Sequence, residues 1–140
     1  MITYRNGNIF ETDCEAIAHG CTNQGRMNSG FAKQVRKLYP EMFTKYKEFC
    51  RQDILAPGDC YLFRSPIKDL PDVFNLITQE QESARLVYIE ESIGKMADLA
   101  LENSINSIAL PHIGTGLGGL NWRDVKPIIK ETFLESSTLI

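Results

Sequence analysis

The feature of this sequence that most constrains its fold is a run of glycines between an apolar segment and a helical pattern. Residues 108–110 form a short apolar run that predicts a buried strand, and apolar residues recur at helical spacing after Asn121. Between them lie Gly114, Gly116, Gly118 and Gly119. Such a strand–loop–helix unit is typical of α/β folds, and glycines let consecutive backbone N–H groups turn toward one anion. The same pattern also suits a connection that binds nothing.

A second unit of the same kind lies earlier in the chain. Residues 16–18 predict a short buried strand, and residues 19–30 form a polar loop that contains three glycines. A helix is then predicted from the helical spacing of Phe31, Val35 and Leu38, with Asn28 or Ser29 as its N-cap. Ligands of open α/β sheets bind at the carboxyl ends of strands. We therefore expect the two loops to share one sheet edge and to form a cleft for a phosphorylated ligand.

The remaining segments continue the alternation of strands and helices. Strands are predicted at residues 2–5, 60–64 and 73–77, helices at residues 41–50 and 88–103, and a last strand from residue 138. This order predicts an α/β protein, with three α/β/α layers and a mixed central sheet. The length of 140 residues suits a single domain that spans residues 1–140.

Composition limits the expected partners. The formal net charge of −3 provides no general basic surface, so free nucleic acid is not expected as a partner. No stretch approaches the roughly 18 consecutive apolar residues of a membrane span, and the first residues lack a signal-peptide pattern. Four cysteines without a CxxC pair and two histidines give no metal-ligand spacing, so neither a metal nor another cofactor is expected. The expectation is a monomer without membrane association, located in the cytoplasm or, if viral, in the host cytoplasm.

Three motifs together resemble the macrodomain family. They are Gly7-Asn8-Ile9, the loop and helix start at residues 18–32, and residues 111–122 with the glycine run. The three motifs occur in the family's order, and the resemblance spans nearly the whole chain. It is most similar to the small branch that includes viral and fungal ADP-ribose-1''-phosphate phosphatases and terminal ADP-ribose glycohydrolases. The resemblance implies a macrodomain with a small-molecule ADP-ribose derivative as its ligand.

The resemblance also implies where this ligand would bind. Asn8, beside Ile9, stands where the family has an Asp that contacts the adenine amine, and an Asn carbonyl accepts the same hydrogen bond without a charge. The earlier loop would wrap the distal ribose and second phosphate, and the later one would cradle the diphosphate. The binding residues implied in these two loops are Gly20, Met27, Asn28, Ser29, Gly30, Phe31, Ala32, His112, Ile113, Gly114, Thr115, Gly116, Leu117 and Gly118.

Two positions depart from the relatives that remove ADP-ribose from glutamate side chains. Those relatives carry a nucleophilic Lys after a Leu-Ile-Thr strand end and an Asp after the Gly-Leu of the later loop. This chain has Gln79 and Gly118 at the matching positions. Neither residue supplies an amine or a base, so a mechanism through a lysine adduct is disfavoured.

His19 and Asn23 are the predicted catalytic residues. His19 ends a predicted strand at the mouth of the expected cleft, and an imidazole titrates near neutral pH, so it could bind the terminal phosphate or accept a proton from water. The alternative is a structural histidine bonded to a loop carbonyl. Asn23 can donate hydrogen bonds to phosphate or ribose oxygens, or can simply shape a turn.

Three functions stay open at this point. The first hypothesis is a hydrolase that converts ADP-ribose-1''-phosphate to ADP-ribose and phosphate. The second is cleavage of an ADP-ribosyl bond on modified protein or nucleic acid. The third is a module that binds ADP-ribose or a related nucleotide signal without catalysis.

Overall fold

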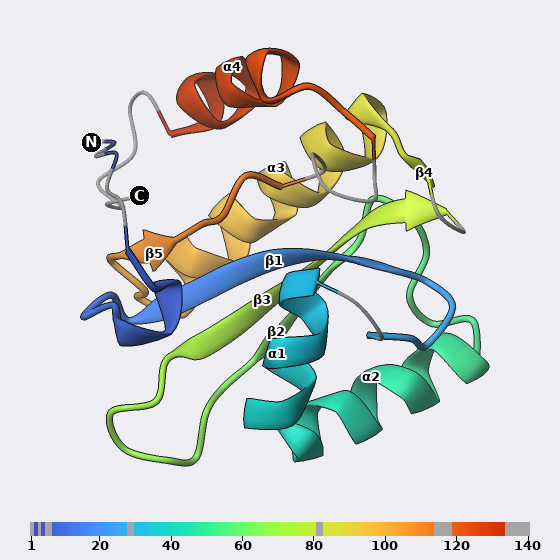
Figure 1. Ribbon diagram of the computed structural model, residues 1–140, viewed down its shortest axis with the longest axis vertical. Coiled ribbons are helices and arrows are strands. Elements are labelled where there is room, and N and C mark those ends of the chain that lie inside the picture. Colours follow the sequence, from blue (N-terminus) through green and yellow to red (C-terminus); the bar gives the residue numbers. More distant parts are fainter. Residues whose placement is uncertain are drawn as a thin grey trace.

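The computed structural model describes residues 2, 4, 7–27, 30–80, 83–113 and 119–133. Figure 1 shows a twisted sheet between two layers of helices, α1 and α2 on one face and α3 and α4 on the other. In chain order the elements are a 3-10 helix η1 (Ile9–Glu11), β1 (Ala16–Thr22), α1 (Gly30–Leu38), α2 (Pro40–Arg51), β2 (Cys60–Phe63), β3 (Asp72–Glu80), β4 (Ser83–Ala84), α3 (Leu86–Glu102), β5 (Ile108–Ala109) and α4 (Trp122–Thr132). None of the described helices is long and apolar enough to cross a membrane.

The sheet is mixed, as the sequence predicts. Its strand order is β2-β3-β1-β5, and β4 pairs with the end of β3. β1 pairs in parallel with β3 along its whole length and with β5 at two positions, whereas β2 and β4 run antiparallel to β3. Because β1, β3 and β5 run in one direction, their carboxyl ends face the same edge of the sheet.

β1 lies at the centre and is buried on both faces, as expected of a central strand with parallel neighbours. Ala16 and Ala18 pack in the core beneath α3 and α4, and Ile17 and Cys21 pack in the core against α1 and α2. This alternation follows the two-residue period of a strand. It places His19 on the α1 and α2 side.

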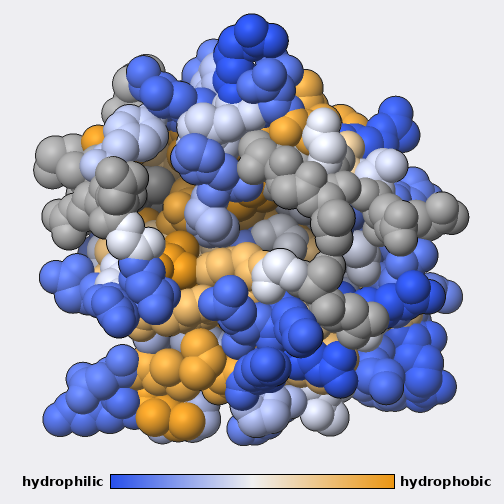
Figure 2. All heavy atoms as spheres, viewed as in Figure 1, coloured by the Kyte–Doolittle hydropathy of each residue, from blue (hydrophilic) through white to orange (hydrophobic). Residues whose placement is uncertain are grey.

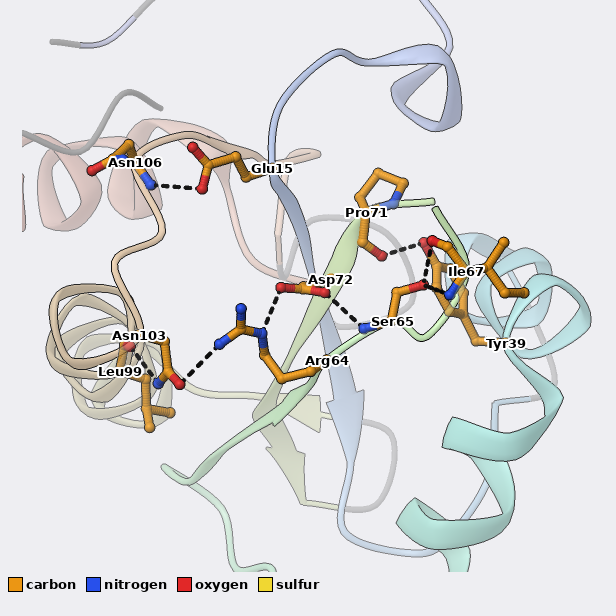
Figure 3. A network of polar contacts seen from close by, with 10 residues as sticks. All are labelled: Glu15, Tyr39, Arg64, Ser65, Ile67, Pro71, Asp72, Leu99, Asn103 and Asn106. Carbon is orange, nitrogen blue, oxygen red and sulfur yellow. Dashed lines mark hydrogen bonds and ion pairs between the residues drawn. The ribbon is translucent and has the colours of Figure 1, made fainter. Parts of the chain in front are cut away.

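Polar contacts hold together the edge at which β3 begins (Figure 3). Asp72 accepts a hydrogen bond from Ser65 N at 2.7 Å and pairs with Arg64 Nε at 2.8 Å. Arg64 also donates to Asn103 Oδ1 at 3.0 Å, which ties this edge to the end of α3. The Tyr39 hydroxyl donates to the carbonyl of Pro71 at 2.8 Å. These contacts tie the start of β3 to the loop before it and to the end of α3.

Several predicted bounds differ from the structure. β1 and β3 continue beyond their predicted ends to Thr22 and Glu80, because their polar residues pair in the parallel ladder. Ile2 and Tyr4 are not in a strand, and the other residues of the first predicted strand lie outside the described residues, as does the strand predicted from residue 138. α4 begins after Asn121, as the helical spacing predicts, and Asn121 caps it: its Oδ1 accepts a hydrogen bond from Arg123 N at 2.9 Å.

Candidate functional site

A groove of about 1060 Å³ lies between the segment that begins at Gly7 and the segment that follows β5. η1 and the start of α1 line one side of it, and α4 lines another. Figure 2 shows hydrophobic atoms in a hollow below α4, with hydrophilic atoms around it. Four of the predicted binding residues line this groove: Asn8, Ile9, Phe31 and His112.

Two stacked ring pairs line the groove. Phe10 of η1 stacks on Phe31 of α1 with ring centroids 4.9 Å apart and planes 10° apart. His112 stacks on Trp122 with centroids 4.1 Å apart and planes 7° apart, which joins the segment after β5 to α4. Flat aromatic faces of this kind are suitable packing surfaces for a purine or a ribose. Trp122 both packs against the core and lines the groove.

Asn8 is exposed and caps η1. Its Oδ1 accepts a hydrogen bond from Phe10 N at 3.0 Å. A carbonyl oxygen has two lone pairs, so one remains for the adenine amine, and the Asn8 amide group is a donor in addition. The cap fixes the side chain at the rim of the groove.

Gly20 brings the two predicted loop regions together. A Cβ atom at Gly20 would lie 3.3 Å from Cγ2 of Ile113 and 2.7 Å from Oγ1 of Thr78. Only glycine permits this approach without displacing a neighbour. The chain after β5 therefore returns to the carboxyl half of β1, which agrees with the expectation that the two loops lie at one sheet edge.

His19 lies in the middle of β1 and is only 1 % exposed. The prediction that it ends a strand at the cleft mouth is wrong, because Gly20, Cys21 and Thr22 continue the ladder with β3. Its Nε2 lies 2.6 Å from Asn75 Oδ1, and Asn75 Nδ2 donates to the Tyr61 carbonyl at 3.1 Å. The Asn75 oxygen is then the acceptor, so His19 carries its proton on Nε2.

Burial lowers the pKa of His19 to about 4, although the hydrogen bond to Asn75 acts in the opposite direction. The imidazole is therefore neutral at pH 7. Its Nδ1 has no hydrogen-bond partner among the described residues. A neutral base without such a partner is chemically able to accept a proton, but a catalytic role for His19 stays a prediction.

Uncharged polar side chains gather where β1 and β3 end. Asn23 follows β1 directly and is half-buried, and Gln79 of β3 lies opposite Thr22 in the ladder. The Thr78 Oγ1 is buried without a hydrogen-bond partner in the described part of the chain. Thr78 is fully buried beside Gly20 and does not line the groove, so this unsatisfied hydroxyl lies behind the site.

The other predicted binding residues have different positions. Met27 is buried and Ala32 partly buried in the core against α1 and α2, beneath the site. Gly30 begins α1 with φ +59, in the left-handed region that favours glycine. Ile113 is buried beside Gly20. Outside the described residues lie Asn28, Ser29, Gly114, Thr115, Gly116, Leu117 and Gly118.

Tyr46 of α2 anchors the loop that follows β1. Its hydroxyl donates to the carbonyl of Thr22 and lies 3.3 Å from the carbonyl of Arg26. Burial raises the pKa of Tyr46, so the hydroxyl keeps its proton at any working pH. Gly25, with φ +76, turns the chain between these two carbonyls. The loop that holds Asn23 is thus fixed from beneath.

Replacing Tyr46 by phenylalanine tests this anchor. Loss of the hydroxyl leaves buried carbonyl groups without their donor, so the free energy of unfolding should fall by about 1–2 kcal/mol. Urea denaturation measures the change. Tyr61→Phe is the matched control, because the Tyr61 hydroxyl has no hydrogen bond to a described residue. Equal losses in the two variants would mean that the anchor contributes nothing specific.

Known proteins resemble this chain in sequence. The model of the Macro domain family matches residues 18–129. A DNA ADP-ribosyl glycohydrolase of Mycobacterium tuberculosis is 32% identical over 136 residues, which cover 95% of this chain and 39% of that protein. An ADP-ribose 1''-phosphate phosphatase of Candida albicans is 25% identical over 150 residues, which cover 94% of this chain and 93% of that protein.

A solved structure agrees with the sequence matches. The macrodomain of Mycobacterium tuberculosis DarG has a TM-score of 0.95 at 30% identity, and the alignment covers 100% of this chain and 95% of that one. The family model matches most of the chain, and the relative named above matches almost all of it. Both relatives are hydrolases of ADP-ribose derivatives by name. The chain belongs to the macrodomain family.

Proposed function

We propose that the chain binds ADP-ribose in the groove and hydrolyses the bond between the distal ribose and DNA. The observation that carries the proposal is the close approach of Ile113 to Gly20, which brings the segment after β5 to the carboxyl edge of the sheet. The similarity to the mycobacterial DNA ADP-ribosyl glycohydrolase supports DNA as the group released. This chain spans 39% of the length of that relative, so the proposal concerns the macrodomain alone.

The site suits a hydrolysis in which water is the nucleophile. Gln79 stands where a lysine adduct would form, and an amide is not a nucleophile at neutral pH. In the proposed step a water oxygen bonds to C1'' of the distal ribose, the bond to the DNA base breaks, and the water proton passes to the released base. Asn23, half-buried directly after β1, is the polar side chain at this edge that would hold the water and the ribose hydroxyls in position.

Turnover of three substrates tests this function. The purified chain is incubated with an ADP-ribosylated DNA oligonucleotide, with a glutamate-ADP-ribosylated protein and with ADP-ribose-1''-phosphate. We expect release of ADP-ribose from DNA to be the fastest reaction. Asn23→Ala should lower kcat on DNA by about 10- to 100-fold through loss of positioning. Fluorescence of Trp122, the single tryptophan of the chain, reports ADP-ribose binding from within the groove wall.

The phosphatase hypothesis is the second candidate. The match to the fungal ADP-ribose 1''-phosphate phosphatase favours it, and attack of water on a phosphomonoester needs no lysine. Release of phosphate without cleavage of the DNA substrate would favour this reaction over the glycohydrolase, and His19→Ala would then show whether His19 takes part. Tight ADP-ribose binding without turnover of any substrate would contradict both reactions and leave a binding module.

A further inference from the structure

The cations of α4 lie on one face of the helix. Arg123, Lys126 and Lys130 are separated by three and four residues, so they follow one another along one side. At 3.6 residues per turn, Asp124 and Glu131 lie about 80–100° away from Arg123, on the side opposite Lys126. None of the three cations forms an ion pair with a described residue. Lys126 lies over the Tyr4 ring, 4.5 Å from its centroid, whereas Arg123 and Lys130 are exposed and available to an anion.

This cationic face is continuous with the groove. Arg123, Lys126 and Lys130 line a hollow of about 830 Å³ along α4, together with one carboxylate, Glu131, and the uncharged residues Asn121, Trp122 and Pro127. Trp122 and Lys126 line both this hollow and the groove. In Figure 2 hydrophilic residues gather at the top of the molecule, over α4, directly above the hydrophobic hollow. A ligand that leaves the groove on the α4 side therefore meets these three cations first.

Two walls of the groove carry opposite charges. Glu11 and Asp13 lie in the wall formed by the N-terminal segment, whereas Lys126 lies in the wall formed by α4. A polyanion attached to the ligand is repelled from the first wall and attracted to the second. The net charge of −3 argues against general nucleic-acid binding, but it does not describe the field at this helix.

We propose that the cationic face of α4, made of Arg123, Lys126 and Lys130, binds the phosphodiester backbone of the DNA strand whose ADP-ribose occupies the groove. This inference rests on the proposed function. Lys130 lies seven positions after Arg123, which is about 10 Å along the helix axis. That is the rise of about three nucleotides in one strand at roughly 3.4 Å each. Contacts of this kind position the strand and do not depend on its sequence.

A membrane surface is a poorer occupant of this face. Amphipathic helices that lie on membranes insert an exposed apolar face beside their cations. In α4 the apolar side chains Val125 and Ile129 are buried in the core against α3. Trp122 and Pro127 border the hollow, but at 3.6 residues per turn they flank the cations on either side and form no continuous apolar stripe to insert. An extended strand of phosphates fits this arrangement better.

A double substitution with a matched control tests the proposal. Arg123→Gln with Lys130→Gln removes two cations and leaves Lys126 at the groove. The control, Lys37→Gln with Lys68→Gln, makes the same charge change at the end of α1 and in the loop between β2 and β3. Both control sites are exposed; α1 lies on the face of the sheet opposite α4, and the loop between β2 and β3 lies at the bottom of the view, away from α4 (Figure 1). If only the net charge of the protein matters, the α4 variant and the control variant will lose the same amount of DNA affinity.

Binding is measured first, by fluorescence anisotropy of a labelled unmodified oligonucleotide and of its ADP-ribosylated form across a salt series. In the α4 variant the slope of log K against log salt should fall by about 1.4, for two lost single-strand contacts. The dissociation constant at 50 mM salt should rise roughly tenfold. The affinity for free ADP-ribose, measured by calorimetry, should not change.

Kinetics separate this inference from the proposed function. If the DNA substrate is cleaved, the α4 variant should show a raised KM and an unchanged kcat. If wild-type protein cleaves no DNA substrate, the proposed function fails, and the salt series still tests the surface. Slopes that are the same in the α4 variant and the control, or no salt-dependent binding of either oligonucleotide by wild-type protein, would overturn the proposal. An acidic peptide that competes more strongly than DNA would also do so.

Discussion

Alanine at position 20 is expected to destabilise the protein and to weaken ADP-ribose binding at least tenfold. The new Cβ would lie 2.7 Å from Thr78 Oγ1 and 3.3 Å from Ile113 Cγ2. Both neighbours are buried, and the β-branched Thr78 has little rotational freedom, so the backbone must shift. Overpacking of this kind costs about 1–3 kcal/mol. Urea denaturation measures the stability, and Trp122 fluorescence measures the affinity.

Gly94 of α3 offers a control in which alanine should raise the stability of the protein instead of lowering it. A Cβ at Gly94 meets no described atom within 4 Å, and alanine is the better helix former, so Gly94→Ala should stabilise the protein by about 0.5–1 kcal/mol. Adding Thr78→Ala to Gly20→Ala removes the hydroxyl in the way and should recover part of the loss. If Gly20→Ala keeps wild-type stability and affinity, the chain after β5 does not approach β1 as closely as described.

Acid is expected to destabilise the protein through His19. In the unfolded chain this imidazole takes up a proton near its ordinary pKa of 6.5, whereas burial holds its native pKa near 4. Between these two pH values the unfolded state binds the extra proton, so the free energy of unfolding falls as the pH falls through this window. The full shift corresponds to about 3 kcal/mol.

Unfolding by urea at pH 7, 5.5 and 4 measures this loss. His19→Gln keeps a donor for Asn75 Oδ1 but cannot take up a proton, so its stability should depend less on pH over the same window. Carboxylates with lowered pKa, such as Glu48, also contribute at acidic pH, but they are present in both proteins. His112→Gln removes the other histidine, which is exposed, and should retain the pH dependence. If His19→Gln loses stability in acid as steeply as wild-type protein, the imidazole is not the source.

The sequence predicted the regular parts of the fold well. The helical spacing of apolar residues located α2, α3 and α4, and the short apolar runs located β2 and β5. β1 was predicted to end at Ala18 because the next residues are polar or glycine. In the structure a partner from another strand accommodates them: Asn75 of β3 bonds to His19, and Ile113 packs beside Gly20. The residue pattern of one strand does not show which partners the neighbouring segments supply to its polar residues and glycines.

The site was predictable in outline and not in detail. The glycine-bearing loops indicated the ligand edge, and the family resemblance indicated Asn8, Phe31 and His112, which line the groove. The ring pairs were not predicted, because Phe10 meets Phe31, and His112 meets Trp122, only after the chain has folded. The contribution of α4 was missed for the same reason. Spacing along a helix shows which residues share a face, but not what that face borders.

The brief pairing of β5 has an evolutionary consequence. β5 joins β1 at two positions only, after which the chain continues to Ile113 without further ladder pairing. Beyond that point the chain is held near the sheet by side-chain packing, such as Ile113 beside Gly20 and His112 on Trp122, rather than by a row of main-chain hydrogen bonds. A single exchange at position 113 can widen or narrow the opening while every strand keeps its neighbours. Descendants of such a protein can acquire new substrates without rebuilding their architecture.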